Sequence, residues 1–235
     1  MYDIVFISYK EVNADKHFNE LYKRFPIVQR VDGVQGIHKA HKTAASKCLT
    51  KMFWVVDGDA KVLDDFNFDF MPEKRNENVV HVWRSKNPIN NLEYGYGGVK
   101  LLPRRLTLEM KEDTTDMTTS ISNRFRAMEQ VSNISVFNTN AFNTFKSAFR
   151  ECVKLSSKVI DRGDDKETDS RLNVWCTVGK DKLYGEYAIK GALAGKEYGS
   201  ESKDLPSKLK LINNFTWLEE YYKYKMKDSV CGLSK

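Results

Sequence analysis

The chain has 235 residues, of which 41% are hydrophobic and 30% charged, a composition that suits one globular domain with a full core. No apolar run reaches the roughly 20 residues that span a bilayer, and the opening MYDIVFISYKE has no basic region before a short apolar run. We therefore expect a cytosolic protein without a membrane segment or a signal peptide. The net charge of +6 permits a polyanionic partner, although 38 basic against 32 acidic residues is a modest excess.

Strand and helix patterns alternate over the first quarter of the chain. We expect strands at residues 2–8, 27–31 and 52–56 and helices at residues 17–24 and 37–49. This order predicts a parallel sheet with right-handed crossovers. In such sheets ligands bind outside the carboxyl ends of the strands, so the loops that follow the three strands should share one rim.

The rest of the chain mixes the two patterns. Strands are expected at residues 79–84, 98–102 and 130–137, and helices at residues 144–160, 171–178, 184–193 and 217–226. There is no internal repeat or obvious linker, and four widely spaced cysteines argue against a zinc site or a disulfide framework. The sequence predicts one α/β domain over residues 1–235, with a mixed, mainly parallel sheet flanked by helices.

The stretch FWVVDGDAKV, residues 53–62, ends a buried strand on two aspartates around a glycine. Asp-Gly is a strong hairpin signal, but the following AKVLDDFNFDF does not continue directly as a strand. A calcium loop would need glycine and glutamate at its sixth and twelfth positions, where the chain has Val62 and Phe68. A cation that also binds a diphosphate needs only one or two protein carboxylates, which Asp57 and Asp59 supply.

Glycine at position 58 would let a diphosphate approach the backbone. The metal would then offset the charge that builds on a leaving diphosphate. These residues predict Mn²⁺ or Mg²⁺ bound by Asp57 and Asp59 in a nucleotide-sugar transferase.

The order YDIVFIS, VDG and FWVVDGD resembles the GT-A class of glycosyltransferases, which carry a DxD motif on a Rossmann-like fold. FWVVDGDA, NPINNLEYGYGGVKLLP (87–103) and TTSIS…NISVFNT are similar to glycosyltransferases of T-even-like and cyanobacterial bacteriophages. Some of these resemble enzymes that transfer a sugar, notably arabinose from UDP-arabinose, to 5-hydroxymethylcytosine. The resemblance implies a UDP-sugar donor, a double-stranded DNA acceptor and the cytoplasm of a bacterial host. It also implies a donor-binding half, residues 1–100, and an acceptor-binding half, residues 101–235.

Further residues are expected around the nucleotide sugar. Ser8 and Tyr9 end the first strand, where GT-A enzymes contact the base, and Asp32 before Gly33 can accept hydrogen bonds from a ribose or base. The other reading of these residues is an ordinary loop and turn.

Two sets of basic residues can hold phosphate. His38 and Lys42 share a helix face near a helix start, and Lys100 follows the Tyr94–Gly98 loop. The alternatives are a solvated helix face and a glycine-rich turn between strands.

The acceptor side is less well marked. Asp116, within DMTTSIS, is preferred over Asp164 and Asp165 as the base of an inverting transferase. Tyr96 offers stacking surface. Lys146, Arg150, Lys154 and Lys158 form a basic stripe that could contact DNA phosphates. The alternative is that they form the solvent-exposed face of an amphipathic helix.

Three other functions remain open. The same chemistry can act on a glycan or a protein, and a nucleotidyltransferase also uses paired aspartates, although its early glycine-rich phosphate loop is absent here. A non-enzymatic basic protein with a structural Asp-Gly turn would bind DNA regardless of metal or UDP.

Overall fold

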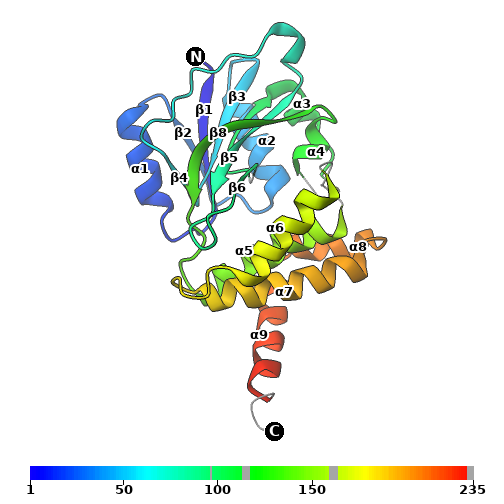
Figure 1. Cartoon of the computed structure of the whole chain (residues 1–235). Coiled ribbons are helices and arrows are strands. Elements are labelled where there is room, and N and C mark those ends of the chain that lie inside the picture. Colours follow the sequence, from blue (N-terminus) through cyan, green and yellow to red (C-terminus); the bar gives the residue numbers. More distant parts are fainter. Residues whose placement is uncertain (96, 113–116, 159–163, 232–235) are drawn as a thin grey trace. The chain divides into compact units, whose positions relative to one another are not determined.

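The structure, a computed structural model, describes residues 1–95, 97–112, 117–158 and 164–231 (Figure 1). The chain divides into two compact units, Met1–Val136 and Phe137–Lys235. The first unit holds the sheet and the second is helical.

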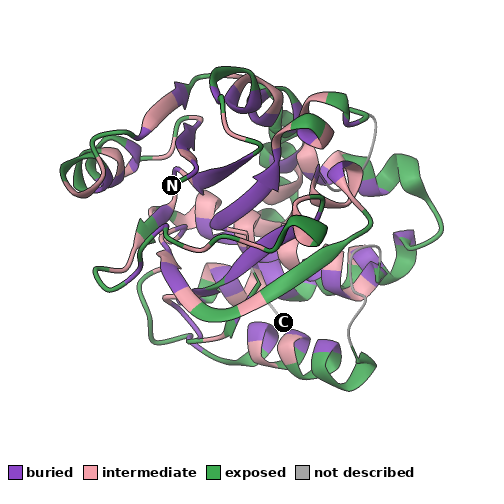
Figure 2. Ribbon diagram, turned by 90° about the horizontal axis from the view of Figure 1, so that it is seen from above, coloured by how far each residue is buried: buried purple, intermediate pink, exposed green. Residues whose placement is uncertain are grey.

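One eight-stranded sheet forms the centre of the first unit (Figure 2). The strand order is β2 (Gln29–Asp32), β1 (Asp3–Ser8), β3 (Met52–Asp57), β7 (Val99–Pro103), β5 (Val80–Lys86), β8 (Phe125–Ser135) and β4 (Ala60–Val62), with β6 (Glu93–Tyr94) beside β5. Its central strands β1, β3, β5 and β7 are buried, whereas the first half of β8 is largely exposed.

β1 lies between β2 and β3, and both contacts are parallel. β7 is antiparallel to β3 and β5, and β8 is parallel to β5. β4 pairs antiparallel with β8, and β6 pairs antiparallel with β5.

The predicted α/β fold with a mixed sheet flanked by helices is confirmed. Parallel pairing holds in β2–β1–β3, where strands alternate with helices, and in β5–β8. The remaining four contacts are antiparallel: β7 with β3 and β5, β4 with β8, and β6 with β5.

Each face of the sheet has its own apolar layer. α1 (Ala14–Arg24) and residues 63–70 pack on the face that carries Trp54 and Trp83. The opposite face is covered by α2 (Ile37–Lys47), α3 (Arg104–Glu109) and α4 (Met117–Ile121). A short 3₁₀ helix, Lys74–Asn76, precedes β5. The small face predicted for α2 is buried at Ala40, Ala44 and Ala45.

The aromatic run after β4 packs as a layer rather than continuing as a strand. The rings of Phe66 and Phe68 lie edge-on, with centroids 5.2 Å apart, and both pack against Trp54. Arg24 fixes the segment's backbone by donating hydrogen bonds to the carbonyl oxygens of Leu63, Asp64 and Phe66.

The second unit consists of α5 (Ala141–Ser157), α6 (Asp165–Thr177), α7 (Gly185–Ser202), α8 (Pro206–Lys210), the 3₁₀ turn Leu211–Asn213 and α9 (Phe215–Cys231). α7 extends well beyond the predicted residues 184–193. Its glycines at 191 and 195 bring its backbone against α5: a Cβ on Gly191 would lie 2.4 Å from the Phe145 carbonyl oxygen, and one on Gly195 would lie 2.4 Å from that of Phe149. Glycine therefore serves close packing here rather than ending the helix.

We expect Gly195→Ala to lower the free energy of unfolding by roughly 1–3 kcal/mol, because the methyl group overpacks the α5–α7 contact. The loss should occur although alanine favours a helix by about 1 kcal/mol over glycine. Urea unfolding measures it. Ser200→Ala, on the exposed side of α7, is the control and should not destabilise; equal stability of both variants would contradict the close contact.

His81 is a fully buried histidine on β5, with its ring centroid 5.3 Å from that of Phe70. Burial lowers the pKa of His81 to about 4. Since the folded-state pKa lies below the ordinary value of 6.5, the stability contribution is complete above pH 6.5 and is lost as the pH falls from 6.5 toward 4.

Between pH 6.5 and pH 5 we expect protonation of His81 to lower the free energy of unfolding of wild type by up to about 2 kcal/mol, at about 1.4 kcal/mol per pH unit. His81→Phe has no such group to protonate, so this part of the fall should be missing in the variant. Urea unfolding at a series of pH values measures the slope, and the value at pH 7 corrects for altered packing. Identical pH slopes for the two proteins would contradict a buried neutral His81.

Candidate functional site at the DGD turn

The carboxyl ends of three strands lie side by side. In the parallel register Ser8 of β1 is opposite Asp32 of β2, and Ile7 is opposite Asp57 of β3. The loops that follow these strands therefore share one rim of the sheet, as predicted from the strand–helix alternation.

The Asp57-Gly58-Asp59 turn is not a hairpin. β3 pairs with β1 and β7, whereas β4, which follows the turn, pairs with β8 at the far edge of the sheet. Two backbone hydrogen bonds fix the turn, from the Asp57 N–H to the Gly98 oxygen (2.9 Å) and from the Val136 N–H to the Asp59 oxygen (2.7 Å). The hairpin interpretation of Asp-Gly is therefore wrong.

A third carboxylate packs against the glycine of this turn. The Tyr9 N–H donates to Oε2 of Glu11 (2.5 Å), and a Cβ on Gly58 would lie 2.6 Å from the same oxygen. Position 58 thus faces Glu11. The sequence analysis assigned this space to a diphosphate and did not predict the contact with Glu11. Glu11 stands in the polar loop after β1, more than forty residues away, and no motif marks it.

The three acidic side chains affect one another. Burial raises the pKa of Asp59 to about 7, and the neighbouring carboxylates of Asp57 and Glu11 add to the rise, with Lys100 acting in the opposite sense. In the described part of the chain Asp59 has no ion-pair partner. The turn therefore places Asp59 beside two other carboxylates, which disfavours its ionised form.

Asp57 forms an ion pair with Lys100, the residue that the sequence analysis expected to bind phosphate. Lys100 Nζ donates to both carboxylate oxygens, at 2.8 and 2.7 Å, and also to the carbonyl oxygen of Gly97. The Lys100 side chain is only 4% exposed, whereas that of Asp57 is 34% exposed.

Ser8 and Asp32 belong to one hydrogen-bonded group. The Ser8 hydroxyl donates to Asp32 Oδ1 (2.5 Å) and accepts from Arg30 Nε (3.1 Å), and the Arg30 guanidinium also bridges to Asp15. Ser8 is buried, but the Asp32 side chain is 59% exposed at the rim. Gly33 turns the chain with φ +71° and donates its N–H to the Ser8 carbonyl.

Three basic residues of α2 differ in their surroundings. Lys42 pairs with Glu112 at 3.0 Å, and His38 is buried. His41, which the sequence reading passed over, is also buried; its Nδ1–H donates to the Ile37 oxygen and its Nε2 has no partner among the described residues. Burial and the nearby Lys100 ammonium lower the pKa of His41 to about 3, so it is neutral.

The predicted acceptor residues are less closely defined. Asp116 and Tyr96 lie outside the described residues. In the second unit Lys146 Nζ lies 4.7 Å from the ring centroid of Phe215, and Arg150 donates to Asn213 Oδ1 at 2.9 Å. These two cations and Lys154 are half-buried, while the opposite side of α5 is buried as predicted at Phe145, Phe149 and Val153.

The acidic turn suits a metal site in which a bound phosphate supplies some of the ligands, rather than one built from protein side chains alone. Nowhere in the described ranges do three His, Cys, Asp or Glu side chains stand ready to hold one ion together. Mg²⁺ is commonly bound by one or two carboxylates, with phosphates and water completing the coordination. Asp57 and Asp59 fit that arrangement in residue type and in lying one residue apart at the end of a strand.

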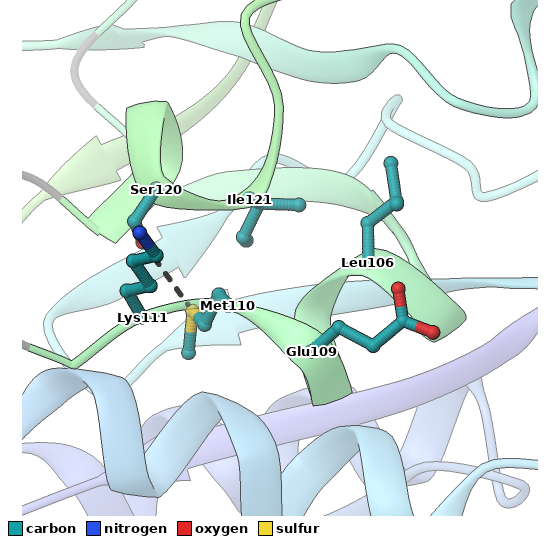
Figure 3. A pocket seen from close by; sticks show the side chains of 6 residues that line it. All are labelled: Leu106, Glu109, Met110, Lys111, Ser120 and Ile121. Atoms are coloured by element: carbon teal, nitrogen blue, oxygen red, sulfur yellow. Dashed lines mark hydrogen bonds between the residues drawn. The ribbon is translucent and has the colours of Figure 1, made fainter.

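A cavity of about 350 Å³ lies elsewhere in the first unit, between α3 and α4 (Figure 3). It is lined by Leu106, Glu109, Met110, Lys111, Ser120 and Ile121. The Ser120 hydroxyl donates to the Met117 carbonyl oxygen (2.6 Å) and lies 3.5 Å from the Met110 sulfur. None of the predicted site residues lines this cavity. Within the described segments, every helix falls short of the length and apolar character needed to cross a bilayer.

No protein-family model matches the chain, and no curated protein matches it in sequence. One similar solved structure is the mannosyltransferase PcManGT from Pyrobaculum calidifontis in complex with GDP-Man and Mn²⁺. The match covers 97% of this chain and 83% of that chain, with 12% sequence identity and a TM-score of 0.43. A similarity of this size assigns neither a family nor an activity.

We expect Gly58→Ala to lower the free energy of unfolding by about 1–2 kcal/mol, because the methyl group displaces the Glu11 carboxylate from the Tyr9 N–H. In a Glu11→Ala background the same substitution should cost much less. Urea unfolding of the two single variants and the double variant gives the coupling energy. Additive effects would show that Glu11 does not occupy the space beside Gly58.

Proposed function

We propose that the protein is a GT-A-type, metal-dependent glycosyltransferase that uses a UDP-linked sugar. The observation that carries this proposal is the meeting of Asp57, Asp59 and Glu11 at one strand end, where the carboxylates of Asp57 and Glu11 add to the rise in the pKa of Asp59. Like charges so placed are unfavourable unless a cationic ligand offsets them. A divalent cation accompanied by a diphosphate meets that requirement.

Asp57 and Asp59 would hold Mn²⁺ or Mg²⁺. The bound metal would supply Lewis-acid stabilisation of the departing diphosphate. The chain's own contribution is a fixed turn, since both ends of the DGD are hydrogen-bonded to backbone groups, Gly98 just before β7 and Val136 just after β8. A pre-formed site loses little conformational entropy on binding.

The nucleoside would lie over the ends of β1 and β2. Ser8 and Arg30 orient the carboxylate of Asp32, whose exposed oxygens can accept hydrogen bonds from ribose or base hydroxyl and N–H groups. Tyr9 would provide stacking surface. The start of α2, which carries His38 and Lys42, would face the phosphates, as helix N-termini favour anions.

For the acceptor we propose 5-hydroxymethylcytosine in double-stranded phage DNA, with arabinose as the sugar. This part depends on the sequence resemblance together with the basic residues Lys146, Arg150 and Lys154 of α5, which would contact DNA phosphates. Tyr96 would stack against the acceptor and Asp116 would take the proton from its hydroxyl group.

We expect UDP to bind only when Mn²⁺ is present, and Asp59→Asn to weaken that binding at least tenfold, because the amide removes a charged metal ligand. Isothermal titration of UDP with Mn²⁺, and again with a chelator, measures both effects. Asp65→Asn, an exposed aspartate after β4, is the matched control and should bind as wild type does.

If wild type binds no UDP with or without metal, the nucleotide-sugar function is wrong and a non-enzymatic basic protein becomes the better explanation. Binding that needs both Mn²⁺ and Asp59 would justify a screen of UDP-sugars against hydroxymethylated and unmodified DNA. Transfer to a glycan instead would keep the donor chemistry and replace the acceptor.

A further inference from the structure

Lys100 uses all of its hydrogen-bonding capacity inside the protein. An ammonium group has three N–H donors, and those of Lys100 go to the two oxygens of Asp57 and to the Gly97 carbonyl oxygen. The lysine side chain is almost fully buried while Asp57 stays partly exposed. The cation thus lies on the inner side of the carboxylate, with the rim on the outer side.

This arrangement differs from that of a lysine that is available to bind a phosphate group. Such a lysine presents a donor to solvent, whereas Lys100 would have to break its bonds to Asp57 before it reached a ligand. The register explains the position: Lys100 on β7 is opposite Val55 of β3, two residues before Asp57. Lys100 is therefore a positioning residue that acts through Asp57.

The same contact engages both oxygens of an aspartate that the proposed metal site requires. A divalent cation at Asp57 would share its ligand with an ammonium group already in hydrogen-bond contact, and the two positive charges repel. We infer that Lys100 competes with the divalent cation for Asp57, so that the metal binds tightly only together with a nucleoside diphosphate. This inference rests on the proposed function.

The diphosphate changes the balance because it brings its own oxygen ligands and negative charge. A metal that carries a diphosphate depends less on Asp57 and tolerates the neighbouring ammonium. By thermodynamic linkage, the factor by which UDP tightens Mn²⁺ binding equals the factor by which Mn²⁺ tightens UDP binding. Lys100 would enlarge that factor by weakening the binding of the metal alone.

The test is a titration cycle: Mn²⁺ alone, UDP alone, and each in the presence of the other. We expect wild type to bind Mn²⁺ at least tenfold more tightly with UDP than without it. In Lys100→Met, Mn²⁺ alone should bind about tenfold more tightly than in wild type, and the factor due to UDP should shrink accordingly. A purely structural role of Lys100 predicts the opposite, weaker metal binding.

Lys51→Met is the matched control, because it removes the same charge from an exposed lysine of the same unit, paired with Glu77 at 3.4 Å. Its titrations should equal those of wild type. Lys100→Gln is the second variant, since its amide can still donate to Asp57 without a positive charge; it should also bind Mn²⁺ alone more tightly.

The outcomes separate this inference from the proposed function. Wild type that binds neither Mn²⁺ nor UDP, even together, overturns both. Wild type that binds the two ligands together, with Lys100→Met or Lys100→Gln binding Mn²⁺ alone no more tightly, overturns only the role of Lys100. The inference also fails if wild type binds Mn²⁺ equally well with and without UDP, a result that needs no variant.

Discussion

The ion pair between Asp57 and Lys100 is the contact around which the candidate site is organised. It joins the end of β3 to β7, the antiparallel strand beside it, and it lies next to Asp59, whose pKa is raised by burial and by the carboxylates of Asp57 and Glu11. Removal of one partner of a buried pair leaves the other uncompensated, which is more costly than the pair is stabilising. The pair therefore links the side chain at the end of β3 to β7, while the backbone of the turn is held separately by the hydrogen bonds of Asp57 and Asp59.

The connections of the sheet explain why this turn can bind a ligand rather than merely reverse the chain. After Asp59 the chain leaves the centre of the sheet and pairs at its far edge through β4, so no second strand runs back along β3. The space beyond the end of β3 is left to side chains from other loops, Glu11 among them. Carboxylates from separate segments converge there because the ends of parallel strands meet at one edge.

Two glycine positions of this chain meet packing requirements rather than a backbone conformation that only glycine adopts. Gly58 admits the carboxylate of Glu11, whereas Gly191 and Gly195 let α7 approach the backbone of α5. A sequence pattern alone associates glycine with turns and helix ends, whereas α7 continues through Gly191 and Gly195 to Ser202. The structure shows that the absence of a side chain matters at these positions, not conformational freedom.

The amino-acid sequence is sufficient to predict the strand–helix alternation of the first sixty residues, the common rim of the three loops and the position of the two aspartates at a strand end. These follow from the periodicity of neighbouring residues and from the general geometry of parallel sheets. The folded chain was needed to show that β7 runs antiparallel beside β3, that Glu11 fills the space at Gly58 and that Lys100 is bound to Asp57. Each of these joins residues more than forty positions apart, as with Lys100 and Asp57 at a separation of 43. Local patterns carry no information on such pairs, because strand order and burial, rather than the adjacent sequence, select which side chains meet.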